Sequence, residues 1–329
     1  MAPIPQLDNA LTLFLSQVLL SLPFLLLGIL FSSLLLVFVD DHKLIARFPR
    51  NRILNSILGS SLGMILPLGQ YGVVPVVRRL LLQGAPLPLA ISFLIAGPTV
   101  NPIVIWFTLS ALAAQPRLIF LRIVLTWFMA IVIALVFSSY REKPSSDRVL
   151  TPLCRVPLLR SGSFIEHQEI NDPLQRSGNL IYEYATPEVH QRPWWEKLTL
   201  LLTNSFQESL ELIPWLLLGS AIAAVIQIYL PQDDLLIWSN DPFRQLLVLM
   251  LFGIVLSLGT LTSTSFLLPL MSNFWIGSSL TFLLTNSVIN LKNLFLLLAV
   301  FRFRPVLYLT ILAIQLILLF GLVLNFYVN

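Results

Sequence analysis

A few polar residues stand inside stretches of sequence that are otherwise apolar. Lys292 has the strongest chemistry among them, because an ionisable side chain deep in hydrocarbon costs at least about 2.5 kcal/mol. It can neutralise an anion or release a proton, so we predict roles in solute binding and in ion coupling. Asn286, Asn290 and Asn293 flank it and supply neutral donors and acceptors. The simpler alternative is a lysine whose long side chain only reaches the membrane interface.

Similar polar groups occur where other apolar segments are interrupted. Residues 66–72 read Leu-Pro-Leu-Gly-Gln-Tyr-Gly, residues 96–102 read Ala-Gly-Pro-Thr-Val-Asn-Pro, and residues 259–265 carry five hydroxyls. Proline leaves backbone carbonyls unpaired, so such breaks must face protein or a water-filled cavity. The alternative is that these polar groups only hold helices together. The predicted solute-binding residues are Gly69, Gln70, Tyr71, Gly72, Pro98, Thr99, Asn101, Pro102, Thr262, Ser263, Asn286, Asn290, Lys292 and Asn293.

Two carboxylates, Glu208 and Glu211, lie three residues apart shortly before Pro214. Both can be interfacial, but Glu211 is close enough to the proline to reach inward, and we predict that it couples transport to a proton. The apolar segments contain no nucleophile–base pair and no cluster of metal ligands, and the single cysteine, Cys154, lies in a polar stretch. We therefore expect no enzyme activity, no cofactor and no metal. No segment resembles an ATP-binding loop, so an ion gradient is the expected energy source.

The composition predicts that helices crossing a membrane hold these residues in place. Hydrophobic residues make up 57% of the chain and charged residues 11%, whereas soluble domains carry about 25% charged residues. Several apolar runs exceed the ~20 residues that a spanning helix needs. The net charge of +4 is expected from membrane orientation alone and does not indicate nucleic-acid binding. We expect a multi-pass, all-α protein of the cell membrane, in contact with lipid.

The chain nearly repeats itself. Residues 22–28 match residues 213–219 at an offset of 191, and residues 92–101 match residues 281–290 at an offset of 189. This pattern predicts a first membrane repeat over 1–140 and a second over 198–329. The 141–197 stretch between them holds six prolines and scattered charges, which is typical of a flexible linker.

The distribution of basic residues predicts how the repeats sit in the membrane. Each half has four apolar segments, in the first half about 11–39, 53–82, 86–113 and 117–140. If all four cross, nine basic residues lie on one side and ten on the other. If the second segment enters and leaves on the same side, sixteen lie inside and three outside, namely Arg117, Arg122 and Arg244. The positive-inside rule favours the second arrangement, with the linker cytoplasmic and both termini outside.

That arrangement predicts two inverted repeats, each with about three spanning helices and one broken or re-entrant hairpin, for eight to ten hydrophobic segments in all. Two short crossings would give the same sidedness as a re-entrant hairpin, so both remain open. Inverted repeats with broken helices are typical of secondary transporters.

The broken segments also carry a resemblance to a known family. Residues 67–76, 84–86 and 93–102 resemble the "predicted permease" family, which includes the exporters of trivalent methylated and aromatic arsenicals, and residues 211–219 and 282–293 are similar to its second-half motifs. The resemblance implies a permease. In that family the hairpin tip often reads Cys-Ser-Cys-Gly, where this chain has Gly69, Gln70, Tyr71 and Gly72. Trivalent arsenic seeks thiolates, so an arsenical is not the expected solute.

We therefore predict a secondary transporter that moves a small, possibly anionic, solute by alternating access. The alternative is a membrane assembly or scaffold protein without transport activity, and the oligomeric state stays open.

Overall fold

The computed structural model describes residues 4–39, 48–49, 51–112, 115–139, 159, 193–229, 241–269 and 274–327. This part of the chain is helical and contains no strand, only an isolated bridge between Leu159 and Phe301. Nearly all of the predicted linker lies outside these ranges, together with Cys154, Asp233 and Asp234. The predicted sidedness of the linker therefore stays a prediction.

The first half contains two long helices and two helices that are broken in the middle. The breaks fall at residues 66–68 and 97–101, as the prolines and glycines predict. Pro67 has no N–H to continue α3, and α4 restarts at Gly69, whose φ of 65° favours glycine. The helices are α1 (Ile4–Phe38), α3 (Arg52–Ile65), α4 (Gly69–Leu82), α5 (Leu87–Ala96), α6 (Pro102–Ala111) and α7 (Pro116–Ser138).

The second half repeats this order of elements. Its breaks fall at residues 257–259 and 289–290, the latter without a proline. The helices are α10 (Trp194–Tyr229), α11 (Pro242–Leu256), α12 (Thr260–Leu267), α13 (Ile276–Val288), α14 (Leu291–Val300) and α15 (Phe303–Tyr327). In the first half α5 packs between α3 and α7, and in the second α13 packs between α11 and α15. This shared packing fits two repeats, and their inverted relation stays a prediction.

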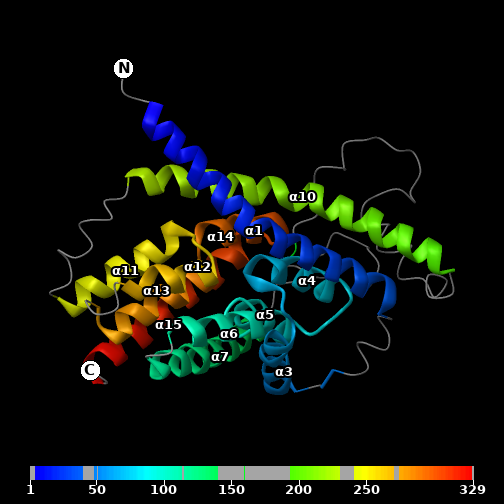
Figure 1. Ribbon diagram of the computed structural model, residues 1–329. Coiled ribbons are helices and arrows are strands. Elements are labelled where there is room, and N and C mark those ends of the chain that lie inside the picture. Colours follow the sequence, from blue (N-terminus) through cyan, green and yellow to red (C-terminus); the bar gives the residue numbers. More distant parts are fainter. Residues whose placement is uncertain are drawn as a thin grey trace.

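The centre of the bundle is formed by α5 and α13, in which almost every residue is buried. The long helices α1 and α10 pack on each other along one side, above the broken helices (Figure 1). Helix α1 also packs closely on α4, because Gly28 and Gly72 lack side chains where the two backbones meet.

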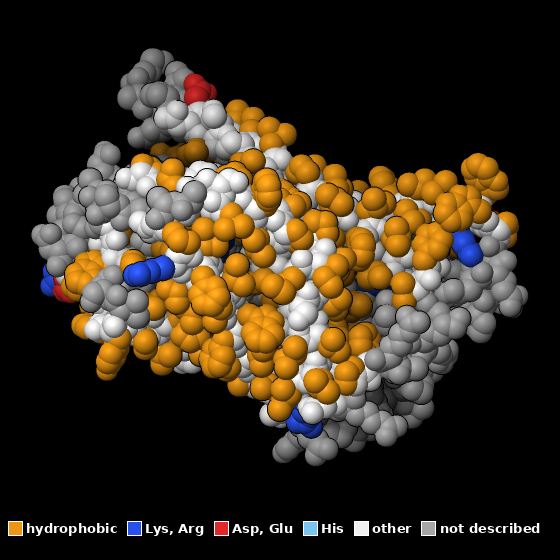
Figure 2. Space-filling view, turned by 60° about the horizontal axis from the view of Figure 1, so that its bottom comes forward, with side chains coloured by type: hydrophobic (Ala, Val, Ile, Leu, Met, Phe, Trp, Pro, Cys, Tyr) orange, Lys and Arg blue, Asp and Glu red, His pale blue; other side chains and the backbone are white. Residues whose placement is uncertain are grey.

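The outer surface is that of a membrane protein. Figure 2 shows a face that is almost wholly apolar, with the Lys and Arg side chains at its margins. Five stretches of the described residues are long and apolar enough to cross a membrane: Asp8–Phe38, Pro116–Ser138, Trp194–Tyr229, Ile276–Val300 and Phe303–Tyr327. The chain is a multi-pass membrane protein with an all-helical fold.

Candidate functional site at the helix breaks

The side chain of Gln70 joins breaks that lie far apart in the sequence. Its Nε2 donates a hydrogen bond to the backbone carbonyl of Asn286 at 2.9 Å, and its Oε1 accepts one from the Thr260 hydroxyl at 3.3 Å. Helix α4 packs on α14, and α12 packs on α6. The chain after the break at residues 66–68 therefore meets the breaks at residues 257–259 and 289–290 in one buried region.

A cavity opens beside this junction. It has about 50 Å³ of space that the centre of a water molecule can reach, and it is only partly enclosed by protein. Helices α4 and α12 both begin at its wall, and neither has a side chain that caps its first N–H groups. Uncapped helix N-termini favour negative charge. Of the predicted site residues, those that line the cavity are Gly69, Gln70, Tyr71, Asn101 and Thr262.

Lys292 lies in the first turn of α14 and is 1% exposed. Its Nζ donates a hydrogen bond to the Ser21 hydroxyl at 3.1 Å and stands 5.3 Å from the centre of the Tyr71 ring. Among the described residues no carboxylate forms an ion pair with it. The lysine is thus a buried cation whose charge is met only by a hydroxyl and an aromatic face, next to a residue that lines the cavity.

Asn101 and Asn290 stabilise the breaks at residues 97–101 and 289–290 by the same geometry. Asn101 accepts a hydrogen bond from the Val104 N–H at 2.8 Å and donates one to the Gly97 carbonyl at 3.1 Å. Asn290 accepts from the Asn293 N–H at 2.7 Å and donates to the Asn286 carbonyl at 2.8 Å. Each amide therefore uses both ends to cap the helix that follows a break and to satisfy a carbonyl before it.

Other predicted site residues carry polar atoms that are buried without a hydrogen-bond partner in the described part of the chain. They are both amide atoms of Asn286, Oδ1 of Asn293, and the hydroxyl of Thr99. Each such group costs about 1–3 kcal/mol, so a cluster of them is expected where a ligand or water completes the bonding. By contrast, Ser263 bonds to the Thr260 carbonyl of its own helix at 3.0 Å, and Pro102 is exposed.

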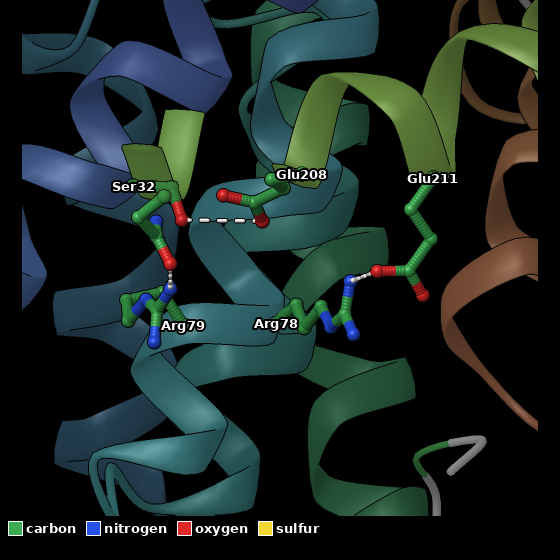
Figure 3. Close-up of polar contacts among 6 residues, drawn as sticks. Ser32, Arg78, Arg79, Glu208 and Glu211 are labelled. Carbon is green, nitrogen blue, oxygen red and sulfur yellow. Dashed lines mark hydrogen bonds and ion pairs between the residues drawn. The ribbon is translucent and has the colours of Figure 1, made fainter. Parts of the chain in front are cut away.

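Four charged residues form a second polar cluster (Figure 3). Arg78 pairs with Glu211 at 2.7 Å, and Glu208 accepts a hydrogen bond from the Ser32 hydroxyl at 3.3 Å. Arg79 donates to Asn204 at 3.3 Å. Both arginines belong to α4 and both acids to α10, so the cluster ties one half of the chain to the other.

The position of this cluster bears on the predicted role of Glu211. Arg78 is nine residues beyond Gly69, which is about 14 Å along α4 at 1.5 Å per residue. Glu211 pairs with Arg78 at that level and is not among the residues at the breaks. Arg78 and Arg79 were among the sixteen basic residues counted on the inner side, and in the structure they lie on α4, with Arg79 6% exposed. The sequence carried a signal for this cluster, because one half has two adjacent arginines and the other has two acids three residues apart.

The surroundings of Arg122 also differ from those that the sequence analysis assumed. We counted it among the three basic residues outside the membrane, but it lies on α7 and is 2% exposed. Its guanidinium donates to the hydroxyls of Thr108 and Thr264, each at 3.2 Å, and to that of Ser287 at 3.0 Å. The count of basic residues used only its nearness to the end of an apolar run, and not the helix face on which it lies, and its side of the membrane stays a prediction.

Comparison with known proteins agrees with this architecture. A family model described as "Predicted permease" matches residues 6–326. The UPF0718 protein YcgR of Bacillus subtilis (strain 168) is 28% identical over 293 residues, which cover 89% of this chain and 89% of that protein. A Streptococcus mutans protein, named as a subunit of a two-component membrane permease complex, is 27% identical over 299 residues, covering 91% and 89%. No solved structure matches. With nearly its whole length matched, the chain belongs to the predicted permease family.

Proposed function

We propose that this permease is a secondary transporter that binds a small anionic solute at the helix breaks and moves it by alternating access. The observation that carries the proposal is the cavity at the junction of the two hairpin tips. Two uncapped helix N-termini begin at its wall, and the buried cation Lys292 stands behind the Tyr71 ring that lines it. Helix N-termini and a cation at one site favour a negatively charged ligand.

The four-charge cluster supports the alternating-access part of the proposal. The cavity opens at the level of Gly69, while the Arg78–Glu211 pair closes the bundle about 14 Å further along α4. An ion pair between α4 and α10 can break and reform as the two halves move against each other. In the orientation that the basic residues favour, the cluster lies nearer the cytoplasm than the cavity does.

Transport by the purified chain tests the proposal. Proteoliposomes would be offered labelled acetate, phosphate and succinate, with protein-free liposomes as the control. We expect uptake of at least one of these anions above the control. If none enters, the proposal of an anion permease is wrong.

The Lys292 variants separate its two predicted roles. Lys292→Met should abolish uptake while the protein stays folded, because removing an unpaired buried charge is neutral or stabilising. Lys292→Arg should keep part of the uptake if the residue holds an anion, since arginine keeps the charge. It should fail as badly as Met if the residue carries a proton, since arginine does not deprotonate. Arg302→Met, which removes an exposed charge, is the matched control. Full uptake by the Lys292→Met variant would show that the solute site does not include Lys292.

The Streptococcus mutans relative favours a second candidate, in which this chain is one subunit of a two-component permease. That candidate predicts that the purified chain alone transports nothing, while native membrane vesicles do. The same set of anions, measured in both preparations, distinguishes the two.

A further inference from the structure

The buried charges of the described residues do not balance. Three basic side chains are buried, Arg79, Arg122 and Lys292, but only one acidic side chain, Glu208. Arg79 and Arg78 both act electrostatically on Glu208, within the cluster that also contains the Arg78–Glu211 pair. The two arginines of that cluster are balanced by its two glutamates. Arg122 and Lys292 therefore remain as two buried cations without an acidic partner in the part of the chain that the structure describes.

The neighbours of Arg122 hold its guanidinium but do not neutralise it. Each of the three hydroxyls that accept its hydrogen bonds donates its own proton to a carbonyl one turn earlier in its helix: Thr108 to Val104, Thr264 to Thr260 and Ser287 to Leu283. They therefore act on Arg122 only as neutral acceptors. The Nε of Arg122 has no partner among the described residues. Arginine does not lose its proton in proteins, so the positive charge persists.

Neither cation lines the cavity itself, but each is linked to residues that do. Val104 and Thr260 line the cavity. Their backbone carbonyls accept hydrogen bonds from Thr108 and Thr264, two of the hydroxyls that contact Arg122. Lys292 contacts the ring of Tyr71, which also lines it. Arg122 meets α6 and α12, whereas Lys292 belongs to α14 and meets α1 and α4. The two charges thus approach the same cavity from different elements.

We propose that the solute is a small dianion and that Arg122 and Lys292 together balance its two charges. The inference rests on the proposed anion permease and deepens it, because it sets the charge of the ligand and adds Arg122 to the residues that bind it. Burying two unpaired cations is costly, and a doubly charged anion in the cavity that both approach would offset that cost. A tetrahedral oxyanion and a dicarboxylate share this chemistry, and the cavity offers the second amide N–H of Gln70 and two helix N-termini as further donors.

The test compares ligands that differ by one charge and little in shape. Protein in lipid nanodiscs would be titrated at constant ionic strength with sulfate against methyl sulfate, and with succinate against succinamate. The shift in melting temperature gives the affinity of each. For the wild type we expect at least one dianion to bind about tenfold or more tightly than its monovalent partner. The pair that shows this difference identifies the class, oxyanion or dicarboxylate.

Substitutions then test whether Arg122 and Lys292 each balance one charge of the ligand. Arg122→Gln and Lys292→Met should each remove the preference for the dianion and leave binding of the monovalent partner, because one cation remains. Arg117→Met, which removes an exposed charge from the same helix, should change nothing. If Arg122→Gln does not fold, Lys292→Met decides the question, since a dianion preference that survives in that variant contradicts the pairing of two cations with two charges.

Three results would overturn the inference: equal binding of dianion and monoanion by the wild type, a dianion preference that survives in Arg122→Gln or in Lys292→Met, or loss of all anion binding in Lys292→Met. The first two leave the anion permease standing if labelled acetate still enters liposomes, so failure of the inference and failure of the proposed function can be told apart.

Discussion

The Arg78–Glu211 ion pair gives the sharpest test of alternating access. A guanidinium nitrogen of Arg78 and a carboxylate oxygen of Glu211 are 2.7 Å apart, and the two side chains are 19% and 27% exposed. Two unit charges about 4 Å apart attract by about 4 kcal/mol at an effective dielectric constant of 20. Exposed pairs measure about 0.2–1 kcal/mol, and breaking a buried pair costs about 3–5 kcal/mol. For this partly buried pair we expect about 2 kcal/mol of coupling, a ~30-fold effect on the opening equilibrium.

The assay measures opening from the side of the charge cluster. Val74 lies on α4 between the hairpin tip and Arg78 and is fully buried, so Val74→Cys, in a Cys154→Ser background, should label slowly in inside-out vesicles. Adding Arg78→Gln or Glu211→Gln should speed labelling ~30-fold, and both together should add little more, because the interaction is already lost.

The charge-swapped protein, with Arg78→Glu and Glu211→Arg, is the decisive control. It should restore slow labelling, since the pair reforms with its ends exchanged. Single variants that label no faster than the background, or a swap that labels as fast as the single variants, would show that the pair does not close this side of the bundle.

Three further predictions concern orientation and the breaks. Ser161→Cys should be labelled from the cytoplasmic side only, and efficient labelling from outside intact cells would reverse the predicted topology. Gly72→Ala should lower the yield of folded protein and its melting temperature by several degrees, because the added methyl group would collide with the backbone of α1. Asn101→Ala and Asn290→Ala should each cost about 1–2 kcal/mol of unfolding free energy, since each amide caps one helix and satisfies one carbonyl. If thermal or denaturant unfolding gives clearly different losses of unfolding free energy for the two variants, Asn101 and Asn290 do not play equivalent roles.

The positions of the helix breaks were predictable because their causes are local. Pro67 lacks a backbone donor, and Gly69 takes a φ of 65° that other residues rarely adopt. The break at residues 289–290 needs no proline, because Asn290 caps α14 with its own side chain. A run of polar residues in a membrane helix was enough to mark it. The apolar composition likewise determined the membrane class without any knowledge of tertiary contacts.

The partners of the polar side chains were decided only by the tertiary structure. Gln70 bonds to a carbonyl 216 residues away, and Lys292 bonds to a serine 271 residues away. No local rule relates such positions, because their distance depends on how whole helices pack. Arg122 is the clearest case: its place near the start of α7 suggested an exposed flank, but the face on which it lies turns it into the protein. The sequence determines where the backbone must break, whereas helix packing determines which charges face the resulting cavity.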